Sequence, residues 1–299
     1  MISLIIPTRN RPESVSLLLD SILRHSTCRD FEILIVDDNS SPSNKDLLRR
    51  VTVKDKFSAI PVRCIYNEKR MYPGYSRNRG VREAKGDILY FVDDDCRFLN
   101  DNLTLISEFY GSQKNTYIIT AGDCICTIAD VSSVLYNDFF RCSLFLFWTK
   151  SRRSLAGRLF SRDRLNNFFL RFAPSLNMAC RISVFEKGSF SQKCRVNEDE
   201  MFCEQVTREG CKILFKKELR VAHNHEFLNF SELLRRLAEL GSYYKSKKIL
   251  KRCVFVILYP LVLSLFTRKP YFVFHYCAMS YAWAFLRNCE TENEDTTIG

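Results

Sequence analysis

The chain has 299 residues, of which 46% are hydrophobic, and carries a formal net charge of +11 at pH 7. This hydrophobic content excludes a wholly disordered chain, and the positive charge indicates an anionic partner such as nucleic acid, a membrane surface or a phosphorylated substrate. The 13 cysteines include no C-x-x-C pair. We therefore expect reduced thiols that fill the core, a cytoplasmic location and no signal peptide.

Apolar strand-like runs alternate with helical patterns through the first half of the chain. In chain order we expect a strand at 3–6 that ends at Pro7, a helix at 12–24, strands at 31–36 and 62–66, a helix at 75–84, and strands at 88–92 and 117–121. Continuous apolar strands alternating with helices predict parallel pairing, with both faces of the sheet covered.

Three consecutive acids, Asp93, Asp94 and Asp95, follow the apolar strand at 88–92. Ligands bind at the carboxyl edge of an open α/β sheet, and adjacent like charges are unfavourable unless a cation lies among them. The triplet therefore predicts a hard divalent ion that also holds a phosphate. An acidic turn without a ligand is the alternative for the triplet taken alone.

Polar residues also follow two other predicted strands. The loop at 7–10 leaves the first strand, and Asp37 and Asp38 leave the second. Three polar segments that follow strands at one edge of the sheet favour a nucleotide pocket there. Neither G-x-G-x-x-G nor G-x-x-x-x-G-K-[ST] follows the first strand, so a metal and side chains such as Arg77 must meet the phosphate charge.

Five segments, in this order, resemble motifs of the family-2 glycosyltransferases. They are 5–10 (IIPTRN), 36–40 (VDDNS), 74–80 (GYSRNRG), 93–95 (DDD) and 198–199 (ED). The resemblance covers about residues 1–245 and implies an α/β GT-A fold, a Rossmann-like mixed sheet flanked by helices. It further implies a nucleotide-binding half at 1–125 and an acceptor half at 126–245.

The resemblance also implies a role for each matched residue. Donor contacts would come from Pro7, Thr8, Arg9, Asp38, Arg77, Asn78, Asp93 and Asp94, with Asp38 at the nucleobase and Asp94 at the ribose. The metal, Mn²⁺ or Mg²⁺, would be held by Asp95, Asp93 and His225. Acceptor contacts would come from Asn177, Met178 and Glu198.

The histidine ligand is chosen between two alternating residues, His223 and His225, which would face the same side of an extended segment. Imidazole is a suitable third ligand beside carboxylates. The spacing of His225 to a predicted helix at 233–241 resembles that of the family, so we expect His225 to bind the metal. A polar strand end without a ligand is the alternative.

Sugar transfer from a nucleoside diphosphate needs a Lewis acid for the leaving group and a base for the attacking hydroxyl. A base across the sugar from the leaving group inverts the anomeric centre in one displacement. We expect Asp199 to be this base. Helix capping is the alternative, because acids in a first turn complement the helix dipole.

Two apolar runs, at 253–266 and 271–286, dominate the end of the chain. Each is shorter than the ~20 residues of a spanning helix, and cations flank them. We therefore expect 246–299 to be a basic, apolar helical extension that lies in the membrane interface, with buried helices as the alternative. The basic, aromatic segment at 141–171 would join 245–287 on an anionic membrane, since the chain has no nucleic-acid-binding motif.

The expected function is the transfer of one sugar per cycle from a UDP-sugar, the commonest donor in the family, to a glycan or polyprenyl-linked acceptor. Trp283 follows Ala282 and not an arginine, so the Gln-x-x-Arg-Trp element of processive synthases is missing. The enzyme would be peripheral on the cytoplasmic face of the membrane. The alternatives are a sugar-nucleotide nucleotidyltransferase, which would need a glycine-rich signature, and a non-catalytic basic membrane or nucleic-acid binder.

Overall fold

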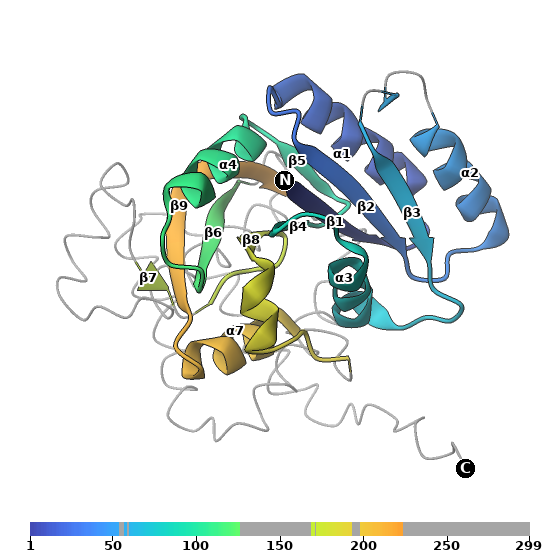
Figure 1. Cartoon of the computed structure of the whole chain (residues 1–299). Helices are drawn as coiled ribbons and strands as arrows, with labels where there is room; N and C mark the ends of the chain where they lie inside the picture. Colours follow the sequence, from blue (N-terminus) through green and yellow to red (C-terminus); the bar gives the residue numbers. More distant parts are fainter. Residues whose placement is uncertain (54–56, 59, 126–168, 171, 193–197, 224–299) are drawn as a thin grey trace, which may run out of the picture. The chain divides into compact units, whose positions relative to one another are not determined.

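The computed structural model describes residues 1–53, 57–58, 60–125, 169–170, 172–192 and 198–223 (Figure 1). The elements are β1 (Ile2–Thr8), α1 (Pro12–His25), β2 (Phe31–Asp37), α2 (Pro42–Thr52), β3 (Val62–Tyr66), α3 (Tyr72–Glu83), β4 (Ile88–Val92), β5 (Cys96–Phe98), α4 (Asn102–Ser112), β6 (Ile118–Ile125), β7 (Phe169–Leu170), β8 (Asn177–Arg181), a 3-10 helix (Ile182–Glu186), α7 (Glu198–Arg208) and β9 (Lys212–His223). The predicted fold class, a mixed sheet flanked by helices, is confirmed.

The strands form one sheet in the order β3-β2-β1-β4-β8-β6-β9-β5, and β7 also pairs with β9. β1 pairs in parallel with β2 and β4, and β2 with β3. β8 lies antiparallel between β4 and β6, which interrupts the predicted parallel pattern, and β6 pairs in parallel again with β9. The carboxyl ends of β1, β2 and β4 consequently meet at one edge of the sheet.

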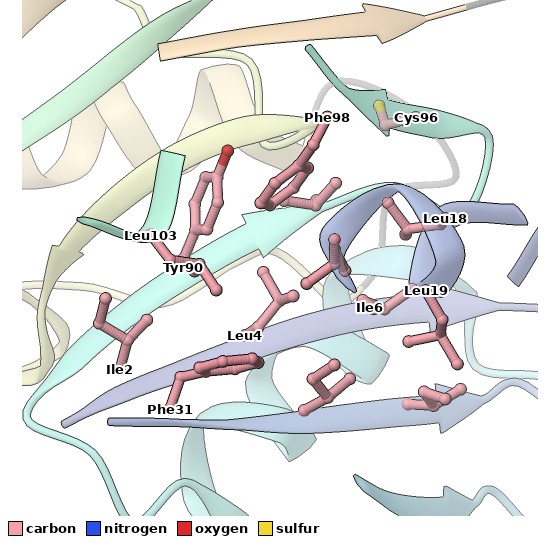
Figure 2. Packing of buried hydrophobic residues seen from close by; sticks show 14 of the residues in the cluster. Ile2, Leu4, Ile6, Leu18, Leu19, Phe31, Tyr90, Cys96, Phe98 and Leu103 are labelled. Carbon is pink, nitrogen blue, oxygen red and sulfur yellow. The ribbon is translucent and has the colours of Figure 1, made fainter. Parts of the chain in front are cut away.

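Helices cover both faces of the sheet, which explains why the strands are continuously apolar. Ile2, Leu4 and Ile6 of β1 pack in a buried cluster with residues of α1, α2 and α4 (Figure 2). Ile5 points to the other face and packs in a second cluster that includes Phe202 of α7. The alternation along β1 follows from the two-residue period of a strand.

The first strand extends further than predicted, because β1 continues through Pro7 to Thr8. Proline cannot donate a hydrogen bond to a neighbouring strand, which usually excludes it from a central strand. Here β4 pairs with β1 only from Ile2 to Ile5, whereas β2 pairs along its whole length. Pro7 therefore lies where β1 has a neighbour on one side only.

Several expectations fall on residues outside those described. They are the helix at 233–241, the extension at 246–299 with the membrane segment at 245–287, and 141–171 apart from Phe169 and Leu170. Within the described part of the chain, no helix combines the length and apolar character that crossing a membrane requires. Among the described cysteines, Cys96, Cys180, Cys203 and Cys211 are buried thiols, which agrees with thiols that fill the core.

The contact of α3 with β1 gives a test of the fold at Gly80. A Cβ at this position would lie 2.5 Å from Cγ2 of Ile5. We expect Gly80→Ala to lower the free energy of unfolding by about 1–3 kcal/mol in urea denaturation, because the helix must move away from the strand. Gly111→Ala in α4 is the control, since no described atom lies within 4 Å of its added carbon. Equal stability of the two variants would contradict this packing.

Candidate active site

The ends of β1 and β4 are joined by a direct hydrogen bond. The Thr8 hydroxyl donates to Oδ2 of Asp94 at 2.6 Å, and both side chains are buried. Burial and the neighbouring Asp95 raise the pKa of Asp94 to about 7, although Arg11 and Thr8 favour its charged form. The acidic triplet therefore starts at the sheet edge where the polar strand exits meet.

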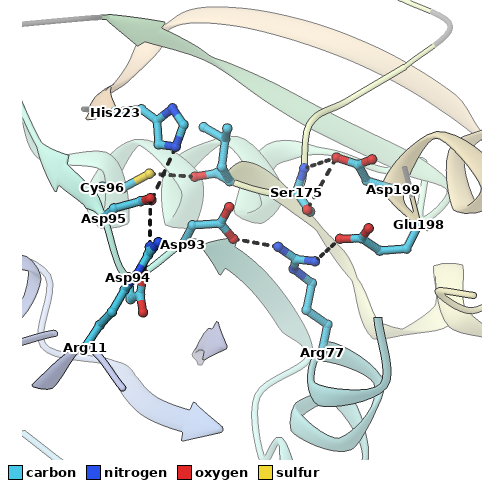
Figure 3. Close-up of polar contacts among 11 residues, drawn as sticks. Arg11, Arg77, Asp93, Asp94, Asp95, Cys96, Ser175, Glu198, Asp199 and His223 are labelled. Carbon is cyan, nitrogen blue, oxygen red and sulfur yellow. Dashed lines mark hydrogen bonds and ion pairs between the residues drawn. The ribbon is translucent and has the colours of Figure 1, made fainter. Parts of the chain in front are cut away.

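The last acid of the triplet faces a histidine on a neighbouring strand (Figure 3). Nε2 of His223 lies 3.3 Å from Oδ1 of Asp95, because Cys96 of β5 pairs with His223 of β9. Burial disfavours the imidazolium, but Asp95 outweighs it and raises the pKa of His223. His225, the histidine expected to bind the metal, lies outside the described residues.

A divalent cation fits this corner of the site. The ligand atoms of Asp95, Cys96 and His223 lie within 4.8 Å of one another. Carboxylate and imidazole ligands together suit ions such as Mn²⁺, and the thiol of Cys96 is buried against the carbonyl of Leu176 at 3.6 Å. Asp95 and His223 are therefore the described residues best placed to hold a metal.

Arg77 of α3 connects the acidic triplet to the start of α7. Its Nη2 lies 2.5 Å from Oδ1 of Asp93, and its Nη1 lies 2.5 Å from Oε1 of Glu198. Its side chain is only 3% exposed and also lies over the ring of Phe190. Burial opposes the charge, yet the nearby acids raise the pKa of Arg77, so the guanidinium stays charged.

Asp199 follows Glu198 in the first turn of α7. Its Oδ2 accepts from the backbone N–H of Ser175 at 3.2 Å, and its Oδ1 from the N–H of Glu200 at 2.9 Å. Burial and the charge of Glu198 raise the pKa of Asp199 to about 7, against the opposing effects of Arg77 and of these two donors. A carboxyl with this pKa can both take up and release a proton near neutral pH.

Asp38 and Asn78 are engaged by the protein backbone. Asp38 accepts from the N–H groups of Met71 and Tyr72, at 2.7 and 2.9 Å, and thereby fixes the loop that enters α3. Asn78 donates to the carbonyl of Phe190 and accepts from its N–H. Their expected contacts with the donor stay predictions.

The remaining expected residues are placed as follows. Pro7 is half-buried in β1, and Arg9 is exposed in the loop after it. Asn177 is buried, accepts a hydrogen bond from the Tyr90 hydroxyl at 2.8 Å and donates to the backbone carbonyl of Asp123. Met178, the next residue of β8, is buried as well. Packing thus accounts for Asn177 and Met178, and the acceptor role expected of them stays a prediction.

Arg11 lies within the site, although no sequence motif assigns it a role. Nη1 of Arg11 is 3.2 Å from Oδ1 of Asp94 and 3.1 Å from Oδ2 of Asp95. The available signal was its position two residues after Arg9, in the loop that leaves the first strand. An arginine in a loop has no motif of its own, so only the fold reveals its partners.

Comparison with known proteins identifies the family. The model of glycosyl transferase family 2 matches residues 3–172, more than half of the chain. The chain therefore belongs to this family and is a glycosyltransferase.

Curated relatives match over the first part of the chain. An uncharacterized glycosyltransferase of Haemophilus influenzae is 37% identical over 119 residues, which cover 40% of this chain and 37% of the relative. The amylovoran biosynthesis glycosyltransferase AmsB of Erwinia amylovora is 31% identical over 121 residues, 39% of each chain. The matched segments thus span less than two fifths of these relatives.

A solved structure matches along most of the chain. The mannosyltransferase PcManGT from Pyrobaculum calidifontis, in complex with GDP-Man and Mn²⁺, superposes with a TM-score of 0.61 at 13% identity, covering 95% of this chain and 85% of that protein. This likeness establishes the GT-A fold.

The raised pKa of Asp199 predicts a pH dependence of sugar transfer. Below about pH 7 the carboxyl binds a proton and cannot accept another, so kcat/KM should fall about tenfold per pH unit on the acidic side and level off above it. A profile of kcat/KM from about pH 5 to about pH 9 measures this limb. A rate that stays level down to about pH 5 would show that no group with this pKa acts as the base.

Proposed function

We propose that this chain is an inverting, non-processive glycosyltransferase that moves a sugar from a nucleoside-diphosphate sugar to a hydroxyl of a glycan or lipid-linked acceptor. The observation that carries the proposal is the bridge through Arg77, which joins an acid of the triplet to the residue beside Asp199. The bridge supports the proposal because it links the acids that we assign to the donor with the helix that carries a carboxyl whose pKa is near neutrality.

The donor side of the proposal rests on the acidic triplet. Asp93, Asp95 and a histidine, either His223 or His225, would hold Mn²⁺ or Mg²⁺. When bound, this ion would act as a Lewis acid for the leaving diphosphate. The Mn²⁺ and GDP-Man of PcManGT support a metal and a nucleotide sugar of this kind. We favour a UDP-sugar, the family's commonest donor.

The acceptor side of the proposal rests on Asp199. Its carboxylate would take the proton of the attacking hydroxyl, while the donors from Ser175 and Glu200 fix its orientation. Attack from the face opposite the leaving diphosphate would invert the anomeric centre in one step. Helix capping accounts for the position of Asp199 but not for its raised pKa, which is unfavourable for a simple cap.

Acceptor and location are inferred from the sequence of the chain. The basic, apolar segments at 141–171 and 245–287 would keep the enzyme peripheral on the cytoplasmic membrane face, close to a polyprenyl-linked or growing glycan. A catalytic domain at 1–245 and an extension at 246–299 fit this division of roles. The role of AmsB in amylovoran biosynthesis supports a glycan acceptor.

Removing the proposed base tests this function. Wild-type protein incubated with Mn²⁺ and a panel of UDP- and GDP-sugars should slowly release nucleoside diphosphate, and an accepted glycan should accelerate the release. Asp199→Asn keeps the shape of the side chain but not its basicity, so transfer should fall by about 10²–10⁴-fold.

Glu209→Gln is the matched control, because Glu209 is exposed just beyond the end of α7. It removes the same charge and should transfer at the wild-type rate. Near wild-type transfer by Asp199→Asn would contradict the role of the base. Pyrophosphate exchange without release of nucleoside diphosphate would instead favour a nucleotidyltransferase.

A further inference from the structure

Arg11 makes contacts that the mechanism above does not use. It precedes the first turn of α1, and its side chain makes no capping hydrogen bond to that helix. Instead its Nη1 faces Oδ1 of Asp94 at 3.2 Å and Oδ2 of Asp95 at 3.1 Å. The side chain is 47% exposed, whereas those of Asp94 and Asp95 are 7% and 13% exposed. Arg11 is therefore a half-exposed cation that reaches two mostly buried acids.

The four oxygens of these two acids are divided among distinct partners. Oδ2 of Asp94 accepts from Thr8 at 2.6 Å, and Oδ1 of Asp95 faces His223 at 3.3 Å. The other two oxygens face the same nitrogen of Arg11. A guanidinium and a metal ion that used these two oxygens would exclude each other.

The chemistry of arginine suggests where the displaced guanidinium goes. A guanidinium binds phosphate oxygens through paired, charge-assisted hydrogen bonds. Arg11 lies in the loop that leaves β1, a loop without the glycine-rich sequence that would supply backbone donors to phosphate. A half-exposed side chain can turn to a nearby diphosphate at little cost in packing.

We propose that Arg11 is a diphosphate-binding residue, held by Asp94 and Asp95 until a divalent cation binds at Asp95 in its place. This inference rests on the proposed function, because the diphosphate is that of the nucleotide-sugar donor. Arg11 thereby couples the two ligands: the cation releases the guanidinium, and the released guanidinium binds the donor. The alternative is a structural counterion that keeps the acids in place for the metal.

The two roles predict opposite changes in metal affinity. With Arg11→Ala in the full-length protein, titration calorimetry with Mn²⁺ alone should show about threefold to tenfold tighter binding, because the guanidinium of Arg11 no longer competes for the acids. With saturating Mn²⁺, the affinity for UDP or GDP should fall by about tenfold or more, because a charge-assisted contact to phosphate is lost. Arg11→Lys keeps the charge but not the paired donors, so it should leave Mn²⁺ binding near wild type and weaken nucleotide binding.

Arg24→Ala is the matched control, since Arg24 is exposed in the last turn of α1, away from Arg11, and the change in net charge is identical. It should bind Mn²⁺ and both nucleotides like wild type, and urea denaturation should confirm that each variant is folded. Weaker Mn²⁺ binding by Arg11→Ala would overturn the proposal in favour of the counterion. Unchanged nucleotide affinity would overturn the phosphate role. If the wild type bound neither Mn²⁺ nor either nucleotide, the proposed function would fail together with this inference.

Discussion

The bridge from Arg77 to Asp93 and Glu198 is the interaction on which the site depends. The guanidinium of Arg77 is buried and lies 2.5 Å from both acids, and breaking a buried ion pair by removing one partner costs about 3–5 kcal/mol. The partners come from the loop after β4 and the start of α7, far apart in the sequence. The bridge therefore links the acidic triplet to the first turn of α7, where Asp199, the proposed base, lies.

The fold delivers the other groups to the same edge of the sheet. Parallel pairing of β1 with β2 and β4 brings Thr8 to Asp94, and the pairing of β5 with β9 brings His223 to Asp95. Burial and the neighbouring carboxylate of Asp95 raise the pKa of Asp94, and a divalent ion would offset this excess of negative charge. Arg11 lowers this excess of negative charge, so its displacement would make the site ready for both metal and diphosphate.

The sequence predicts the parts of this structure that are local. Runs of apolar residues predict β1 to β4, and the acids after β4 predict a ligand site, because period and strand exits are visible in the chain. α2 and α4 were not predicted, since their signals are the caps Ser41 and Asp101 and not a long apolar stripe. Contacts such as Arg77 with Glu198 depend on topology, and no local pattern specifies them. The preference for His225 over His223 rests on its spacing to the expected helix at 233–241, and both His225 and this helix lie outside the described residues.

The coupling between Arg77 and Glu198 tests the account most directly. A double-mutant cycle with Arg77→Met and Glu198→Gln, followed by urea denaturation, compares the free energies of unfolding of the single and double variants. The buried ion pair predicts a coupling energy of about 1–3 kcal/mol, because each substitution alone removes the same contact. Additive losses would contradict this expectation, since they would show that Arg77 and the first turn of α7 are held in place independently of each other.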